Sequence, residues 1–302
     1  MKKGILFVLT AAFLASCQQE ENEGVASVDR VTITPIITRA TEVNFEDQDQ
    51  IGLSVTKEDG TVYATNELMT FNDGAFAGSL KWYPEGADKS SFCLLYTSDA
   101  YYPYSATGVP TSFTVHADQT TNYGISDFMA ASKSDVLPSV NSISMIFKHM
   151  LTKLVINVTN ETNLDISSIV LKGSVPTANI DWATMKTTVN ESAAATDITA
   201  QQVTKNKTFR AIVVPQTAAF TLAVTTSDNN TLMQKLVSTD LVQGGQYSVN
   251  IRVLPDNIIV TLSGEIENWT DEGEIKGDEP EVPFEEHDGC LLYTSDAADE
   301  AR

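Results

Sequence analysis

Runs of alternating apolar and polar residues recur along most of this chain, and they constrain its fold more than any other feature. Clear examples are Val31-Thr32-Ile33-Thr34, Ile51-Gly52-Leu53-Ser54-Val55 and Ser112-Phe113-Thr114-Val115. A period of two places successive side chains on opposite faces of a β-strand, whereas an α-helix repeats about every 3.6 residues. Further runs rich in Val, Ile, Thr and Phe cover residues 154–158, 168–171, 209–214, 220–224, 244–251 and 258–262. The sequence therefore predicts an all-β protein, whose best helical candidates are the short segments 126–132 and 149–154.

Two short polar segments have the composition of tight turns between strands. They are Glu58-Asp59-Gly60-Thr61 and Asn72-Asp73-Gly74. Asp-Gly pairs suit hairpins because both residues tolerate the positive φ angles that such turns require. We therefore expect a hairpin at each position.

The length of the chain favours two β domains. Its 302 residues, less a leader and an acidic C-terminal stretch, exceed what one small sandwich needs. We expect one domain over 30–148 and a second over 149–270, divided near Phe147–Leu151, where one strand ends and another begins. No Pro/Gly-rich linker marks this boundary, so the domains should pack closely. Residues 271–289 are predicted to be an acidic, solvated tail.

The first residues have the pattern of a lipoprotein export signal. Lys2 and Lys3 precede an apolar stretch over 4–13, which is followed by Leu14-Ala15-Ser16-Cys17. The apolar stretch is shorter than the about 20 residues of a membrane-spanning helix. We predict a signal peptide over 1–16, lipidation of Cys17 by acyl chains such as palmitate, and a flexible acidic tether over 17–29. The alternative is an ordinary secretory signal followed by a chance cysteine.

The remaining cysteines lie in a repeated string. Residues Cys93–Ala100 recur letter for letter as Cys290–Ala297, and no wider similarity surrounds the two copies. The segment 290–302 resembles a translated sequencing adapter and is predicted not to be native. Residues 93–99 are interpreted as a possible foreign insertion. If both copies are genuine, a disulfide between Cys93 and Cys290 is the alternative.

Composition and motifs argue against several functional classes. The net charge of −21 and the isoelectric point near 4.3 disfavour nucleic-acid binding, which needs clustered Lys and Arg. No P-loop, dinucleotide fingerprint or serine-hydrolase elbow occurs in the sequence, and His116, His149 and His287 are too far apart for metal-ligand spacing. We therefore predict no catalytic residue, no cofactor and no metal site. His149 is interpreted as a packed or edge histidine.

Several motifs, in order along the chain, resemble those of the fimbrillin family, the lipoprotein pilins of Bacteroides and its relatives. They are Leu14–Cys17, Thr38–Thr41, Ile51–Val55, Ala100–Tyr104, Ser126–Met129, Phe147–Leu151, Val213–Thr217 and Gly245–Tyr247. The resemblance implies two transthyretin-like Greek-key β-sandwich domains in tandem. It also implies a structural or accessory subunit of surface fimbriae that mediates adhesion, is displayed at the outer membrane and is not an enzyme.

The resemblance further implies assembly by strand exchange with other pilus subunits. Val31, Ile33, Pro35 and Ile37 share one face at a period of two, which suits a first strand that fills a groove in its own subunit. In the family the replacing strand comes from the C-terminal end of the incoming subunit. Arg39 follows at once and is the predicted site of proteolytic processing. The alternative is an exposed loop arginine after a permanent edge strand, and Arg30 brackets the same segment.

Two other functional classes stay open at the level of sequence. A surface lipoprotein that does not polymerise would bind a glycan or a host ligand through exposed aromatics such as Tyr101, Tyr102 and Tyr104. Core packing is the competing interpretation of these side chains and of Trp82 and Tyr83. A β-sandwich hydrolase with a carboxylate pair is the third class, and nothing in the sequence singles out such a pair.

Overall fold

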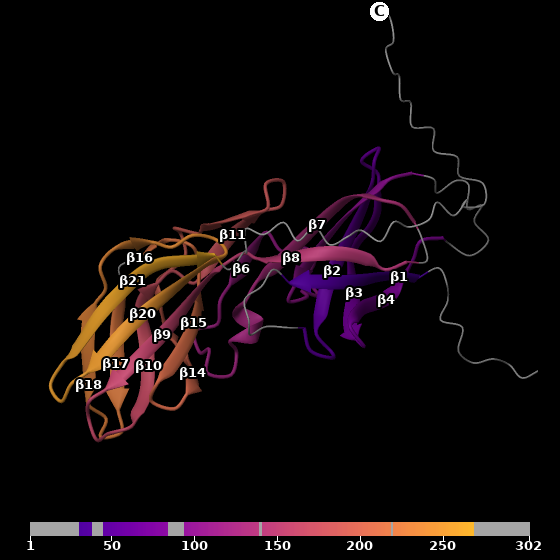
Figure 1. Cartoon of the computed structure of the whole chain (residues 1–302). Coiled ribbons are helices and arrows are strands. Elements are labelled where there is room, and N and C mark those ends of the chain that lie inside the picture. Colours follow the sequence, from indigo (N-terminus) through magenta and orange to yellow (C-terminus); the bar gives the residue numbers. More distant parts are fainter. Residues whose placement is uncertain (1–29, 38–44, 84–93, 139–140, 219, 269–302) are drawn as a thin grey trace, which may run out of the picture.

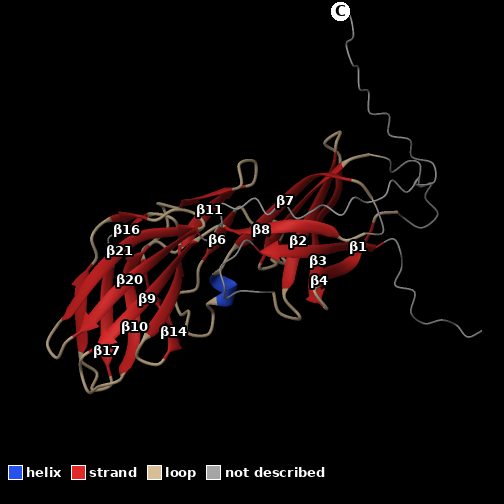
Figure 2. Ribbon diagram, in the orientation of Figure 1, coloured by secondary structure: helices blue, strands red, loops and turns tan. Residues whose placement is uncertain are grey.

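The computed structural model describes residues 30–37, 45–83, 94–138, 141–218 and 220–268. Strands dominate the described residues, and the helix among them is a single 3₁₀ turn, η2 (Gly124–Ser126) (Figure 2). The prediction of an all-β protein is confirmed. The two helical candidates contribute instead to β7 (Met129–Val136) and β9 (Thr152–Asn160). In the described part of the chain, no helix has the length and apolar character to cross a membrane.

The N-terminal half forms a closed barrel of strands in the order β1-β4-β3-β2-β5-β7-β8 (Figure 1). Besides β7, its strands are β1 (Arg30–Ile37), β2 (Gln50–Lys57), β3 (Val62–Asn72), β4 (Ala75–Lys81), β5 (Tyr96–Tyr102) and β8 (Ile143–His149). β1 runs antiparallel to β4 and parallel to β8. Because β1 pairs on both sides, it is the strand through which the first and last parts of the barrel meet.

The two predicted turns are confirmed. Asp73 and Gly74, between β3 and β4, both have positive φ, at 51° and 86°. Gly60 has a φ of 83°, and the Asp59 carboxylate accepts a hydrogen bond of 2.8 Å from the Thr61 amide. That hydrogen bond lowers the pKa of the Asp59 carboxyl.

The C-terminal half packs two sheets against each other. One sheet has the order β14-β15-β9-β20-β21 and the other β13-β10-β17-β18. Besides β9, the first contains β14 (Gln201–Thr204), β15 (Thr208–Val213), β20 (Gly245–Val253) and β21 (Ile258–Asn268); the second contains β13 (Thr196–Thr199), β10 (Ile166–Ser174), β17 (Thr221–Thr226) and β18 (Thr231–Lys235). Their inward side chains form one core, to which Ile156, Phe209 and Leu222 belong. A short pair, β16 (Thr217–Ala218) with β19 (Thr239–Asp240), lies outside the two sheets.

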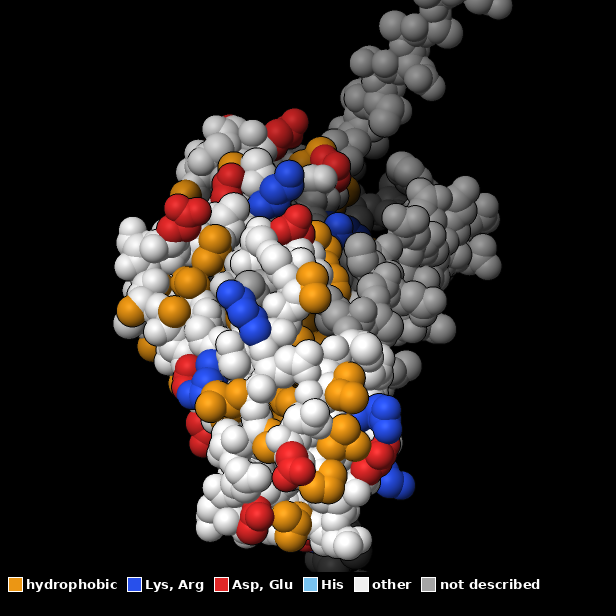
Figure 3. Space-filling model, turned by 90° about the vertical axis from the view of Figure 1, so that its left-hand side faces the viewer, with side chains coloured by type: hydrophobic (Ala, Val, Ile, Leu, Met, Phe, Trp, Pro, Cys, Tyr) orange, Lys and Arg blue, Asp and Glu red, His pale blue; other side chains and the backbone are white. Residues whose placement is uncertain are grey.

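The outer face of this end of the molecule carries hydrophobic side chains in small separate groups among polar ones (Figure 3). The most exposed large side chains of the half are Val237 at 79% and Met233 at 59%. Single exposed apolar residues are common on soluble proteins and need no special explanation.

A small third sheet connects the two halves. β6 (Ser112–Thr114) lies in the connection between barrel strands β5 and β7, yet it pairs with β11 (Thr177–Asp181), which in turn pairs with β12 (Lys186–Val189). A division of the chain at 148/149 therefore places the paired strands β6 and β11 on opposite sides of the boundary. The expected strand end and strand start are present there, since β8 ends at His149 and β9 begins at Thr152.

The barrel has its own core, separate from that of the C-terminal half and rich in aromatic rings. Phe45 lies with its ring centroid 4.8 Å from that of Phe76 and 5.2 Å from that of Phe147, both edge to face. Trp82 and Tyr96 also belong to this core. Aromatic pairs in such arrangements add about 0.5–1.5 kcal/mol beyond the burial of their surface.

Part of the repeated string lies inside the barrel. Tyr96–Asp99 form the first part of β5, which pairs with β2 and β7, and the side chains of Tyr96 and Ser98 are buried. Cys93 and Cys290 lie outside the described residues. Whatever the origin of residues 93–99, four of them supply hydrogen bonds and core packing in this fold.

Candidate functional site

The first strand, β1, closes the barrel between β4 and β8. Val31 and Ile33 are completely buried in the barrel core, and Ile37 packs against it half-buried. Pro35 and Ile37 line a cavity of about 240 Å³ together with Phe45, Phe71 and Gly74. The predicted period of two is confirmed, because these apolar residues face inward while Thr34 and Ile36 are exposed.

The two edges of β1 are engaged over different parts of its length, with β4 alongside Arg30–Ile33 and β8 alongside Ile33–Ile37. Ile33–Ile37 lie in register with Ile143–Phe147 of β8, and Thr32 and Ile33 face Ala77 and Phe76 of β4. The Thr34 hydroxyl donates a hydrogen bond of 2.8 Å to the hydroxyl of Ser142. Loss of β1 would leave the facing edges of β4 and β8 without main-chain partners, and unpaired edges recruit other strands.

The two site residues predicted from sequence, Cys17 and Arg39, lie outside the described residues. The described part of β1 ends at Ile37, two residues before Arg39. The sequence alone therefore places Arg39 after β1, and its role as a processing site stays a prediction.

The motifs Ile51–Val55 and Ala100–Tyr104 contact each other at Tyr101. Its ring lies over Gly52 of β2, where a Cβ atom would collide with the ring. Its hydroxyl donates a hydrogen bond to the Asn66 side chain, and Asn66 in turn donates to the carbonyl of Ser105 at 2.9 Å. Burial raises the pKa of the Tyr101 hydroxyl, which favours the protonated, donating form. Tyr101 thus anchors the connection that follows β5 to the outside of the barrel.

The motifs Ser126–Met129 and Phe147–Leu151 contact each other through a buried ionisable pair. Asp127 precedes β7, and His149 ends β8; the Asp127 Oδ2 and His149 Nδ1 atoms lie 2.8 Å apart, and both side chains are 1% exposed. Met129 and His149 are partners at the ends of β7 and β8. The pair therefore lies at the end of the barrel from which the chain continues into β9. The interpretation of His149 as a packed residue is confirmed. The sequence offered no signal that Asp127 would be its partner.

The motifs Val213–Thr217 and Gly245–Tyr247 each supply a side chain that bonds to the main chain of a loop in the C-terminal half. The Gln216 amide donates to the Val175 carbonyl at 3.0 Å and accepts from the Val175 amide at 3.2 Å. The Tyr247 hydroxyl donates to the Asp240 carbonyl at 2.9 Å and accepts from the Val242 amide at 3.1 Å. Both side chains satisfy main-chain groups that the loops would otherwise leave unpaired.

The aromatic residues considered for glycan stacking have mostly core positions. Tyr101, Tyr102 and Trp82 are 2%, 7% and 1% exposed, while Tyr83 and Tyr104 are half-buried. Core packing is therefore confirmed for Tyr101, Tyr102 and Trp82, so Tyr101 and Tyr102 are not the exposed aromatics that the glycan-binding hypothesis needs. Within the described residues, no group of three or more His, Cys, Asp and Glu side chains is arranged to hold a metal ion.

Comparison with known proteins decides the family. The sequence profile of the fimbrillin-like family matches residues 38–269. This chain belongs to the fimbrillin-like family. The matched region begins at the residue after β1 and ends one residue after β21, so it includes both halves of the fold apart from β1. No curated protein sequence matches this fimbrillin-like chain.

Two solved structures of similar fold are from Bacteroides species. One is described as a putative cell adhesion protein from Bacteroides ovatus, with 21% identity, a TM-score of 0.63, and coverage of 81% of this chain and 99% of that one. Another, with the same description, is from Bacteroides uniformis, with 22% identity, a TM-score of 0.60, and coverage of 80% and 99%. At this level of identity the likeness concerns the fold.

Proposed function

We propose that this fimbrillin-like chain is a structural or accessory subunit of cell-surface fimbriae that assembles by protease-triggered strand exchange and mediates adhesion. Its role is structural, and the two halves act as transthyretin-like β-sandwich domains over 30–148 and 149–270. The observation that carries the proposal is β1, which closes the barrel by pairing with β4 and β8 at once. A strand from another subunit that pairs with β4 and β8 and fills the same core positions can replace β1 without unfolding the rest.

The energetics of β1 favour exchange over simple loss. Burial of Val31 and Ile33 contributes about 1.5–3 kcal/mol for each side chain, in addition to two main-chain ladders. Departure of β1 forfeits all of this and exposes the barrel core. A strand from a neighbouring subunit that fills the same positions recovers it, with main-chain hydrogen bonds supplying affinity and alternate side chains supplying register.

Export as a lipoprotein places this reaction at the cell surface. Lipidation of Cys17 anchors the precursor to the outer membrane, and cleavage after Arg39 then separates the tether and β1 from the rest of the subunit. Each buried methylene of an acyl chain contributes about 0.8 kcal/mol, so several chains hold the precursor until it is cut.

The first test is cleavage of the purified mature chain with an arginine-specific protease. We expect cutting after Arg39 and heat-labile ladders of oligomers on a denaturing gel. Arg39→Gln should abolish both, whereas Arg30→Gln, at the other end of β1, should leave both intact. Cleavage after Arg39 without oligomers would count against a polymerising role.

A second test fixes β1 in place. The Thr34 and Ser142 hydroxyl oxygens are 2.8 Å apart at the surface, so Thr34→Cys with Ser142→Cys should allow a disulfide between β1 and the segment before β8. The test uses a chain in which Cys93 and Cys290 are replaced by serine. The oxidised protein should be cut by the protease but stay monomeric, and reduction of the disulfide should allow it to polymerise. Equal polymerisation of the oxidised and reduced forms would show that β1 is not the exchanged strand.

A further inference from the structure

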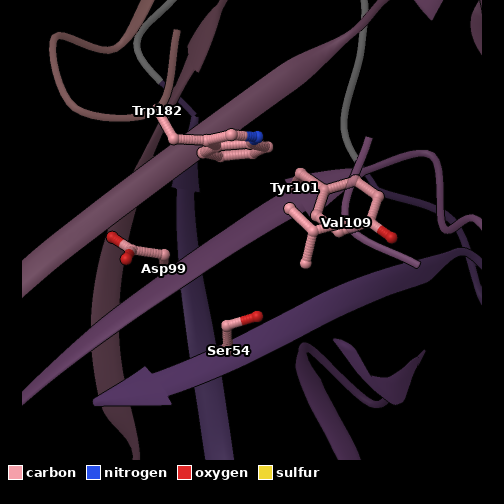
Figure 4. A pocket seen from close by; sticks show the side chains of 5 residues that line it. All are labelled: Ser54, Asp99, Tyr101, Val109 and Trp182. Carbon is pink, nitrogen blue, oxygen red and sulfur yellow. The ribbon is translucent and has the colours of Figure 1, made fainter. Parts of the chain in front are cut away.

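A small pocket lies between the outside of the barrel and the C-terminal half. It has a volume of about 210 Å³ and is lined by Ser54, Asp99, Tyr101, Val109 and Trp182. Figure 4 shows the Trp182 indole nearly edge-on, so that one flat face covers the space framed by Asp99 on one side and by Tyr101 with Val109 on the other. The Ser54 hydroxyl lies opposite the indole.

The pocket is built on ordered elements. Ser54 of β2 and Asp99 of β5 are direct cross-strand partners, and Tyr101 follows two residues later on the same face. Trp182 lies just after β11 and is fixed by its indole N–H, which donates to the Pro110 carbonyl at 2.8 Å. The Trp182 and Tyr101 rings are 5.9 Å apart between centroids. Both walls are therefore held in place before any ligand arrives.

The pocket carries one carboxylate, that of Asp99. Among the described residues, no hydrogen bond and no ion pair reaches the Asp99 carboxylate, which is half-buried. Asp181, next to Trp182, differs because it accepts hydrogen bonds from the Ala183 amide and the Thr184 hydroxyl. A net charge of −21 adds a field that attracts cations to the whole protein.

We propose that this pocket binds the ammonium or guanidinium end of a basic side chain presented by a partner polypeptide. A cation meets both features at once, since it pairs with the Asp99 carboxylate and is attracted to the face of the Trp182 indole. A pyranose would bring many hydroxyl groups to a pocket whose polar side chains, apart from the Tyr101 hydroxyl already bonded to Asn66, are Asp99 and Ser54.

The size of the pocket points to a side chain as the source of the cation. Pockets for drug-sized molecules occupy about 300–1,000 Å³, and this one is smaller. It therefore fits the end of a Lys or Arg side chain whose main chain stays outside. This binding does not depend on β1 or on Arg39, so it stands or falls separately from strand exchange. It takes residues 93–99 as part of the native chain, because Asp99 is one of them.

The test follows the indole N–H resonance of Trp182 by NMR in the full mature chain. The probes are N-acetylarginine amide, N-acetyllysine amide, the neutral isostere N-acetylcitrulline amide, and methyl β-glucoside. We expect the two cations to shift the Trp182 resonance saturably, with dissociation constants on the order of millimolar, as befits ligands this small. The citrulline compound should bind at least about tenfold more weakly, and added salt should lower the affinity for the two cationic compounds.

Two variants provide the controls. Asp99→Asn keeps the shape of the side chain and should remove the preference for arginine over citrulline without changing the melting temperature. Glu191→Gln, in the exposed turn after β12, removes the same charge and should leave binding intact.

Several results would overturn the proposal. They are equal binding of arginine and citrulline compounds, unchanged binding in Asp99→Asn, and a response to the glucoside alone, which would make the pocket a sugar site. A pentapeptide with a central arginine should bind more tightly than the single amino acid. Weaker binding of the peptide would contradict a polypeptide partner and indicate a free small cation.

Discussion

The barrel and the C-terminal half are both β structures of alternating residues, but they are closed in different ways. The barrel depends on β1, an N-terminal strand that pairs with β4 and β8 and directly precedes the predicted cleavage site. The C-terminal half consists of two open sheets that share one core, and side chains bond to the main chain around them, such as Gln119 to Ile212, Gln216 to Val175 and Tyr247 to Asp240. Closure of the barrel thus depends on one strand at its N-terminal end, whereas the C-terminal half depends on the core between two sheets.

The largest expected effect concerns the buried pair between the two halves. Asp127→Asn leaves His149 without its carboxylate partner in a fully buried position, and we expect a loss of about 3–5 kcal/mol of unfolding free energy. Urea denaturation measures this loss. The matched control is Asp197→Asn, because the Lys172–Asp197 pair is exposed, with side chains 41% and 51% accessible, and exposed pairs contribute about 0–1 kcal/mol. Similar losses for both variants would contradict a special role for the buried pair.

The next effect separates the two halves directly. Ile33→Ala in β1 and Leu171→Ala in β10 both remove fully buried side chains, and each should cost about 2–5 kcal/mol. Hydrogen exchange should show faster opening of β4 and β8 in Ile33→Ala, and of β13 and β17 in Leu171→Ala. Ile36→Ala, 43% exposed on the same strand as Ile33, should have little effect. Global opening in both core variants would mean that the halves unfold as one unit.

The smallest effect tests the contact between β2 and Tyr101. A methyl group at Gly52 would collide with the Tyr101 ring, so Gly52→Ala should destabilise the protein by about 1–3 kcal/mol. Gly124→Ala is the control, because no atom lies within 4 Å of the added carbon. Thermal unfolding measures both variants. A neutral Gly52→Ala would show that the ring moves aside freely and that Tyr101 does not anchor the loop after β5.

The sequence by itself determined the type of structure and the inward face of β1. Alternation at Val31 and Ile33 and the Asp73-Gly74 turn are local properties, since strand faces and positive φ depend on a few neighbouring residues. Only the tertiary structure decided which segments meet. Thr34 contacts Ser142 across 108 residues, Trp182 bonds to Pro110 across 72, and Asp127 finds His149, although no local pattern encodes these pairs. Strand order and the pocket at Asp99 arise from packing between distant segments, where the same alternating pattern fits many partners and shape and burial select one.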